Sequence, residues 1–471
     1  DCESVNIVNT QYIFKCEGGA FKNSAIERLP FVNGVKSIGN IVVDFDYKCD
    51  NVILPDDREE ITAIEYSLSL AKLKKLTLHK CSTLMTVFED ILPERICFSG
   101  KNYIDIDGIN LMKSLNNVRY IDIEGSDTYK SIDGIIYSID GKTLYACPSD
   151  RNETIIIPEG VEMIEEEAFC ACAISEIMFP STLREIKSRA FSGCYELRKV
   201  NFGIGITEIG SHQNVGVFKY CSRLTSIEIP SQVTQIGVSA FEGTGIEKLV
   251  LHEGLKTIED YAFYHCKINN LSLPKSLDSV GVLAFTDANE IHAEKYLATI
   301  LCAIINTSMY YCSDMHKVTK LMIDGKTAYI PKIVPDEGVI CDIDDILCAF
   351  FNEDVVSEST MENVYRLFEK GSMMEGRENM AIGICLDDKD NWVAREYVGR
   401  HSSMIASRLI KEGKAEKIEK FLSIGAMNRQ AAEMILEYAE NKKQVTLVAG
   451  VLDIMHKGHD GQNAINQIFS I

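Results

Sequence analysis

Three closely spaced aspartates are the first residues of this sequence whose types and spacing could do chemistry. Asp342, Asp344 and Asp345 resemble the D-x-D pattern of metal-dependent transferases, in which carboxylates hold a divalent cation. Carboxylates also favour the positive end of a helix dipole, and the apolar residues that follow this group predict a helix. We therefore interpret the three aspartates as the first turn of a helix rather than as a metal site.

A pair of histidines near the end of the chain is a second candidate for metal chemistry. His456 and His459, with Asp460 beside them, could share a metal ion if one face of a helix brought them together. Gly458 favours a helix end at this point instead, and a histidine at a helix C-terminus is ordinary. We therefore do not predict a metal site here.

Two further groups have incomplete ligand patterns. Tyr103, Asp105 and Asp107 resemble part of a calcium loop, but the acidic ligand of its twelfth position is missing. Cys170 and Cys172 form a C-x-C pair, but no second pair or nearby histidine completes a tetrahedral zinc set. We predict no metal and no cofactor.

The composition argues against several other functions. The chain has 471 residues, of which 46% are apolar, so it can bury a large core. Its net charge of −21 repels a phosphate backbone, so nucleic acid is not an expected partner. The most apolar segment, 296–305, has about half of the roughly 20 residues that span a bilayer, and predicts a buried helix and no membrane span. The sequence contains no P-loop, nucleophile elbow or H-E-x-x-H motif.

An internal repeat determines the architecture that must position any site. The repeats are marked by Phe169, Phe191, Phe218, Phe241, Phe263 and Phe285, at intervals of 22, 27, 23, 22 and 22 residues. Each of these phenylalanines except Phe218 ends a V-x-x-I-x-x-x-A-F pattern, and alternating apolar residues upstream predict a short strand with one buried face. A single unit cannot cover its own apolar face, so the units must stack into a solenoid. The long interval contains an insertion at 211–215.

A small residue follows each repeat phenylalanine by three positions. These residues are Cys172, Cys194, Cys221, Thr244, Cys266 and Ala288. A free cysteine behaves as a small hydrophobe, so we interpret the series as a buried spine rather than as a redox or metal site.

The repeat resembles a known family. The segments IPEGVEMIEEEAF, FPSTLREIKSRAF and IPSQVTQIGVSAF closely resemble the BspA-like leucine-rich repeat family of bacterial and some protist proteins, over residues 154–288. The resemblance implies a surface or secreted protein that acts in adhesion or host-protein binding. It provides no catalytic residues, because members of the family share none.

The strand residues between the inward apolar positions should point outward and align into one sheet face. By register these residues are Glu176, Met178, Lys199, Asn201, Ser226, Glu228, Lys248, Val250, Asn270 and Ser272. The row is mixed in character. It predicts either a surface that binds a protein or glycan through many weak contacts, or an ordinary solvated sheet.

We divide the chain into four segments. They are degenerate repeats over 1–130, the clear repeats over 131–290, a connecting helix and capping hairpin over 291–335, and a helical domain over 336–471. Leu76, Ile96 and Ile121 mark expected strands in the first segment. Asp-Gly pairs at 140–141 and 324–325 predict hairpins with type I′ turns that complete or cap coils.

After residue 335 the spacing becomes helical. Ser359 and Glu362 form an expected capping box, Gly425 an expected helix end, and Asn428 an expected N-cap. The predicted fold class is an α/β leucine-rich repeat solenoid, with short strands stacked in a sheet, followed by an α-helical domain of stacked helix pairs.

Two functional hypotheses follow. The first is a non-enzymatic adhesion or protein-interaction molecule whose solenoid sheet face binds a protein or glycan. The second is an enzyme with a site in the C-terminal helical domain or at its junction, which requires convergence of at least two of Asp342, Asp344, His401, His456 and His459. The many cysteines favour a reducing compartment such as the cytoplasm, but the family resemblance favours the cell surface or secretion, and we adopt the latter.

Overall fold

The computed structural model describes residues 21–39, 41–54, 63–64, 69–79, 92–100, 115, 117–307, 318–353, 355–371 and 374–468. Its chain divides into two compact units, Asp1–Lys267 and Ile268–Ile471.

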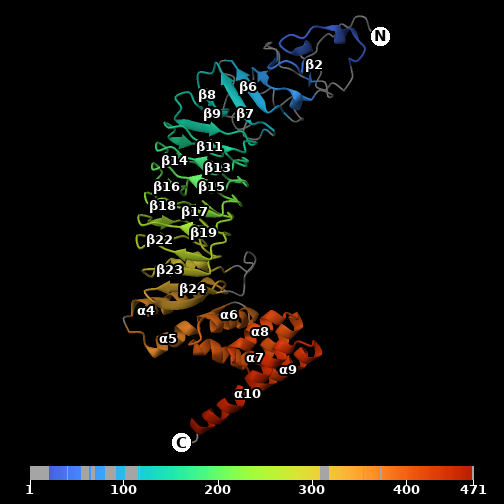
Figure 1. Ribbon diagram of the computed structural model, residues 1–471. Coiled ribbons are helices and arrows are strands. Elements are labelled where there is room, and N and C mark those ends of the chain that lie inside the picture. Colours follow the sequence, from blue (N-terminus) through green and yellow to red (C-terminus); the bar gives the residue numbers. More distant parts are fainter. Residues whose placement is uncertain are drawn as a thin grey trace. The chain divides into compact units, whose positions relative to one another are not determined.

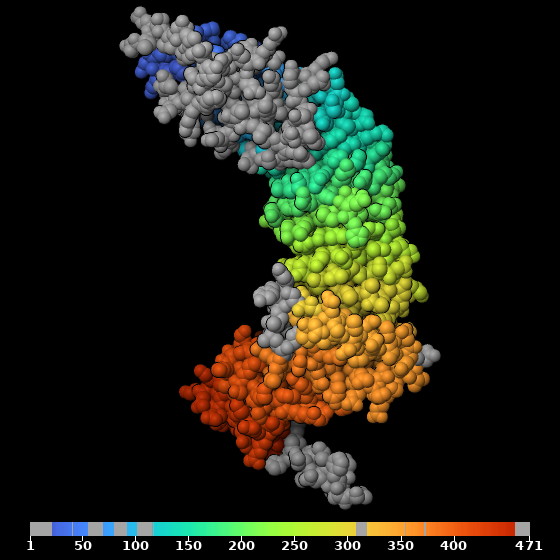
Figure 2. All heavy atoms as spheres, turned by 180° about the vertical axis from the view of Figure 1, so that it is seen from behind, coloured from blue at the N-terminus to red at the C-terminus, as the bar shows by residue number. Residues whose placement is uncertain are grey.

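The first unit is a solenoid in which each coil contributes short strands to two separate rows (Figure 1). One row contains β11 (Thr154–Ile156), β13 (Glu176–Met178), β15 (Lys199–Asn201), β17 (Ser226–Glu228) and β19 (Lys248–Val250). The other row contains β12 (Met163–Ile164), β14 (Glu185–Ile186), β16 (Glu208–Ile209), β18 (Gln235–Ile236) and β20 (Thr257–Ile258). Paired strands within a row are parallel and come from successive coils, as where Ile155 pairs with Ile177 and Ile177 with Val200. The coils follow one another in sequence order, as the successive colours of Figure 2 show.

The repeat phenylalanines form a column in the core of this unit. The rings of Phe169, Phe191, Phe218, Phe241 and Phe263 stack on one another, with centroids 4.7, 5.0, 5.3 and 5.2 Å apart. Each ring is at most 1% exposed. The stack confirms that the repeat positions coincide in space, because each coil covers the apolar face of the next. Phe285 is likewise buried, in the second unit.

The N-terminal part of the first unit contains a parallel sheet of the predicted kind. Its strands are β3 (Val52–Ile53), β5 (Leu76–Leu78), β6 (Arg95–Ser99) and β7 (Tyr120–Glu124), in that order. Leu76 pairs with Ile96, and Ile96 with Ile121, which confirms the expected strands and their register. The remaining elements are η2 (Ala25–Arg28), β1 (Val35–Ile38), β2 (Ile41–Phe45), β4 (Ala63–Ile64) and η3 (Leu70–Lys72).

The two predicted Asp-Gly hairpins differ from each other. Strands β8 (Tyr129–Ile132), β9 (Ile135–Ser138) and β10 (Thr143–Ala146) are antiparallel neighbours. Asp133 and Gly134, both with positive φ, form the tight turn between β8 and β9, whereas only Gly141 has positive φ in the β9–β10 loop. The predicted type I′ turn at 140–141 was therefore wrong, because a loop of residues 139–142 replaces it. Asp324 and Gly325 have φ values of 50° and 79°, as a type I′ turn requires.

The second unit combines a small sheet with helices. Its strands are β21 (Asn270–Ser272), β22 (Ser279–Val280), β23 (Glu290–Ala293), β24 (Val318–Ile323) and β25 (Lys326–Pro331), of which β21, β23, β24 and β25 are hydrogen-bonded in that order. Its helices are α3 (Ile300–Ile304), α4 (Glu337–Asn352), α5 (Glu358–Tyr365), η5 (Leu367–Lys370), α6 (Met374–Asp387), α7 (Trp392–Glu412), α8 (Ala415–Ile424), α9 (Arg429–Asn441) and α10 (Val445–Ile468). Helix α3 is the predicted buried helix, with four of its five residues buried.

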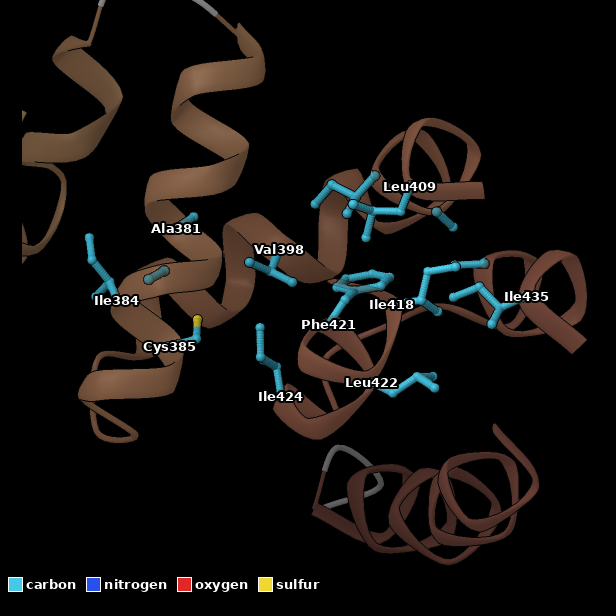
Figure 3. Packing of buried hydrophobic residues seen from close by; sticks show 14 of the residues in the cluster. Ala381, Ile384, Cys385, Val398, Leu409, Ile418, Phe421, Leu422, Ile424 and Ile435 are labelled. Carbon is cyan, nitrogen blue, oxygen red and sulfur yellow. The ribbon is translucent and has the colours of Figure 1, made fainter. Parts of the chain in front are cut away.

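The apolar faces of α6 to α10 pack into one core. Figure 3 shows Phe421 of α8 near Val398 of the neighbouring helix α7 and near Ile418 of its own helix. Phe421 is fully buried, as are Ile405 of α7 and Ile435 of α9. This core confirms the predicted helical C-terminal region, because a helix with one apolar stripe is stable only when another element covers the stripe.

Several predicted helix ends are displaced. Helix α4 begins at Glu337 with Asp336 as its N-cap, so Asp342, Asp344 and Asp345 lie inside the helix, and their placement in its first turn was wrong. The predicted capping box at Ser359 was also wrong, because Ser357 is the N-cap of α5.

The remaining helix ends lie in α8, α9 and α10. The end of α8 at Gly425 and the N-cap of α9 at Asn428 are confirmed. Helix α10 continues through Gly458, so the expected helix end there was wrong.

Candidate functional site

The residues expected to point outward in the strands are accessible to solvent. Lys199, Asn201, Ser226, Glu228 and Lys248 are exposed, whereas Glu176, Met178 and Val250 are half-buried. In the second unit, Asn270 and Ser272 of β21 are also exposed. Among the described residues, seven of these ten side chains are thus exposed and three are partly covered by neighbouring side chains.

The strands β15, β17 and β19 of the first unit form a groove at this face. Its cavity measures about 520 Å³. Its lining residues are Arg198, Lys199, Val200, Asn201, Phe202, Ser226, Ile227, Glu228, Pro230, Lys248 and Val250. Six of them belong to the row predicted from the sequence, and the rest were not predicted.

The groove lies where the strand ladder is interrupted. Strand β15 pairs with β13, and β17 pairs with β19, but β15 and β17 do not pair with each other. The opposite row is interrupted at the same coil, because β14 and β16 belong to different sheets. The main-chain hydrogen bonds between coils continue beside the phenylalanine column, where the Phe191 N–H donates to the Val217 carbonyl at 2.9 Å. The long interval of 27 residues in the repeat was the signal that could have predicted the break.

The groove contains more cationic than anionic side chains. Lys199 pairs with Glu176 of the preceding strand at 2.7 Å, and its side chain is 66% exposed. The Glu228 carboxylate lies 2.8 Å from the His252 ring. Lys248 makes no ion pair with any residue that the structure describes. These exposed contacts contribute little to stability, so the charges are available to a ligand.

The corresponding face of the N-terminal sheet is covered. Thr77 of β5 and Cys97 of β6 occupy the position between inward apolar residues, yet they are 4% and 0% exposed. Burial raises the pKa of the Cys97 thiol to about 11, which keeps it protonated. An accessible sheet face is thus a property of β11 to β19 in this unit, where Ile156 of β11 is 69% exposed, and it does not extend to Thr77 and Cys97 of the N-terminal sheet.

The cysteine spine has the predicted structural character. Cys194 donates to the Phe169 carbonyl at 3.0 Å, and Cys221 donates to the Phe191 carbonyl at 3.2 Å. Each thiol thus satisfies a buried carbonyl of the preceding coil. Burial raises the pKa of Cys172 and Cys194 well above the ordinary value of a thiol. The described residues contain no group of three or more His, Cys, Asp or Glu side chains that could hold a metal ion.

The residues proposed for an enzymatic site have separate partners. Asp342 pairs with Lys370 at 3.1 Å, and Asp344 accepts a hydrogen bond from the Tyr296 hydroxyl at 2.5 Å. The Nδ1 atom of His401 lies 2.9 Å from the carbonyl of Tyr397, one turn earlier in α7.

The remaining residues considered for metal binding or catalysis are exposed or lie outside the described residues. The His456 side chain is exposed. The side chains of His459 and Asp460 lie outside the described residues, as do Tyr103, Asp105 and Asp107.

A second cavity, of about 490 Å³, lies between the sheet and α6 within the second unit. Asp387 accepts hydrogen bonds from the Tyr329 hydroxyl at 2.7 Å and pairs with Lys320 at 2.9 Å. The hydrogen bond from Lys320 lowers the pKa of Asp387, which burial opposes and the Tyr329 hydroxyl reinforces. The polar groups bond to one another, so they hold α6 against the hairpin. Sequence reasoning missed this cluster because its members are 58 residues or more apart from Asp387 along the chain.

In the part of the chain that the structure describes, no helix is both long and apolar enough to cross a membrane.

Comparison with solved structures gives several matches, among them three bacterial proteins. A leucine rich cell surface protein from Faecalibacterium prausnitzii is 23% identical, with a TM-score of 0.32, over 55% of this chain and 64% of that chain. The pneumococcal vaccine antigen PcpA is 20% identical, with a TM-score of 0.30, over 60% of this chain and 66% of that chain. A leucine-rich repeat protein from Bacteroides ovatus is 17% identical, with a TM-score of 0.31, over 57% of this chain and 63% of that chain. The matched part spans slightly less than two thirds of each of these proteins.

A search of the curated proteins gave no match. The sequence profile of the BspA type leucine rich repeat region, which comprises six copies, matches residues 1–91, 137–215 and 213–331. These residues make up more than half of the chain and include the stacked coils described above. The chain therefore belongs to the BspA type leucine-rich repeat family.

Proposed function

We propose that this protein is a non-enzymatic binding protein of the cell surface or the secreted fraction, which holds a protein or glycan on the sheet face of its solenoid. The observation that carries the proposal is the groove at β15, β17 and β19, which coincides with the row of outward residues. Membership of a repeat family typical of surface proteins supports the same conclusion. A stacked sheet offers many weak contacts over a long surface, which suits recognition of a macromolecule.

A surface location is compatible with the cysteines. The thiols of Cys172, Cys194 and Cys221 are buried, so an oxidant outside the cell does not reach them. The Faecalibacterium relative is itself described as a cell surface protein. Burial therefore protects these three thiols outside a reducing compartment, whereas Cys302 and Cys341 are exposed.

The proposal is tested with the full chain on a glycan array and on an array of purified extracellular proteins. A variant with Lys199→Ala, Glu228→Ala and Lys248→Ala removes three exposed side chains of the groove. A matched control, with Glu208→Ala and Lys256→Ala, changes exposed charges at the other strand row.

We expect the chain to bind specific array members, the triple variant to bind them at least tenfold more weakly, and the control to bind as the native chain does. Equal binding by the native chain and the triple variant would show that the sheet face is not the binding surface.

A further inference from the structure

The break between β15 and β17 leaves main-chain polar groups of the groove without the partners found in the other coils. At the other junctions of this row a main-chain bond follows each strand, as from Phe179 N–H to the Asn201 carbonyl at 3.0 Å. The next such bond along the unit runs from Ile229 N–H to the Val250 carbonyl at 2.9 Å. No equivalent bond joins Phe202 N–H to the Glu228 carbonyl across the break.

The direction of the free groups follows from the pairing of β17. In a parallel sheet, the N–H and C=O groups of alternate residues point to the same neighbouring strand. The Ile229 N–H bonds to the Val250 carbonyl of β19, so Ile229 and Ile227 direct their main-chain groups toward β19. The main-chain groups of the alternate residues, Ser226 and Glu228, therefore point toward β15. The side chains of Asn201 and Ser226 are exposed and make no hydrogen bond with another described residue, so the groove offers donors and acceptors together.

The groove is lined by three cations and one carboxylate, although the chain is strongly acidic. Arg198, Lys199 and Lys248 line it together with Glu228. Glu176 pairs with Lys199 at 2.7 Å and Glu196 with Arg198 at 3.9 Å, so Lys248 is the lining cation that has no ion pair among the described residues. The chain as a whole carries a net charge of −21. A ligand with many negative charges is repelled at long range, whereas one or two carboxylates can reach the lysines at short range.

The floor of the groove is apolar. Val200 and Phe202 are half-buried rather than fully covered, and Pro230 and Val250 complete an apolar strip. The aromatic side chain of the lining is Phe202, which is half-buried because its ring packs against Phe179 and Phe218, at centroid distances of 5.8 and 6.1 Å. An apolar floor beside main-chain donors and acceptors suits an amino-acid chain better than a glycan.

We propose that the groove binds an extended peptide segment of a protein partner, in which one or two carboxylates neighbour an apolar side chain. This inference rests on the proposed function and names the occupant of its site. The carboxylates lie against Lys199 and Lys248, the unpartnered main-chain groups bond to the peptide backbone, and the apolar side chain packs on Phe202 and Val250.

The test uses the full chain on an array of random 12-residue synthetic peptides, in parallel with an array of neutral and sulfated glycans. We expect binding to peptides that place Asp or Glu next to Leu, Ile or Phe, and at least a tenfold loss when the carboxylates are replaced by amides. Lys248→Glu should weaken the same peptides at least tenfold, and Lys248→Gln by a smaller factor. Lys256→Glu is the matched control with the same charge change at the opposite row, and we expect it to leave binding unchanged.

Four results would overturn this inference. Equal affinity for the carboxylate and amide peptides excludes the role of the lysines. Equal weakening by Lys256→Glu and Lys248→Glu shows a general effect of charge rather than a site. Binding to glycans alone, lost in the triple alanine variant, excludes the peptide while the proposed function stands, and binding to neither array contradicts both.

Discussion

At the scale of single residues, the cysteines show how one residue type has two environments in the same chain. Cys172, Cys194 and Cys221 are buried along the phenylalanine column, where a small thiol fits and donates to a carbonyl of an earlier coil. Cys302 and Cys341 of the second unit are exposed. The thiolate is the reactive form, and burial suppresses it.

We therefore predict selective alkylation of the folded protein. Iodoacetamide should modify Cys302 and Cys341 while leaving Cys172, Cys194 and Cys221 unmodified, as peptide mass spectrometry of the native protein will show. The control is the same reaction in denaturant, in which all five should react. Modification of the spine at the rate of Cys341 in the native state would contradict its burial.

At the scale of elements, the N-cap of α5 is Ser357, whereas the sequence pattern predicted Ser359. The Ser357 hydroxyl accepts a hydrogen bond from Thr360 N–H at 3.1 Å, whereas Ser359 lies inside the helix. Ser357→Ala should therefore reduce the free energy of unfolding of the second unit by about 1 kcal/mol, the usual effect of losing an N-cap. Ser359→Ala should change it by only a few tenths of that amount. Urea unfolding followed by circular dichroism compares the two variants, and equal effects would refute the assignment.

The contact of α6 with the β24–β25 hairpin predicts a dependence on pH. The pKa of Asp387 is lowered by the hydrogen bond from Lys320, so its stabilising effect is present above the ordinary pKa of about 4 and is lost as the pH falls below it. The pKa of Lys320 is raised by the same bond, so this contribution persists up to about pH 10.

Asp387→Asn should reduce the free energy of unfolding at pH 7 by on the order of 1 kcal/mol, because the pair is partly exposed. The difference between variant and native protein should become smaller as the pH falls from 7 to 3, because protonation of Asp387 removes its charge. Urea unfolding at the two pH values measures it, with Asp390→Asn at the exposed end of the following turn as the control. A difference that is unchanged at pH 3 would exclude the carboxylate as its source.

At the scale of the whole chain, the position of the groove is explained by the one coil that contains an insertion, the coil that ends at Phe218. Ile209 precedes Phe218 by nine residues, whereas Ile186 precedes Phe191 by five. A turn at 211–214 takes up the extra four, with Ser211 N–H bonded to the Asn214 carbonyl at 2.9 Å. Because both strand rows are interrupted at this coil, we attribute the groove to the insertion.

Deletion of residues 211–214 restores the five-residue spacing and should close the groove. We expect the Phe202 N–H to bond to the Glu228 carbonyl, as in the other coils, and its amide exchange to slow at least tenfold. Hydrogen exchange measured by mass spectrometry or NMR tests this, with Phe179 N–H, already bonded, as the internal control. Unchanged exchange at Phe202 would mean that the insertion does not cause the break.

The sequence by itself determined the repeated coil and much of the register. The stacking of the phenylalanines, the pairing of Leu76 with Ile96 and the burial of the cysteines follow from period and side-chain type, because each coil contacts only its neighbours. The outward direction of Lys199 and Lys248 follows in the same way from the alternation along a strand. The boundaries at 130, 290 and 335 stay predictions.

Only the tertiary structure decided where the accessible face begins and where it opens. Thr77 and Cys97 have the same place in their strands as Met178, yet they are buried, which no local pattern indicates. The break beside β15 is a mismatch between one long coil and its neighbours, and its geometry depends on how both coils pack. Periodicity predicts which side chains share a row, whereas the space above and between those side chains depends on residues distant in the sequence.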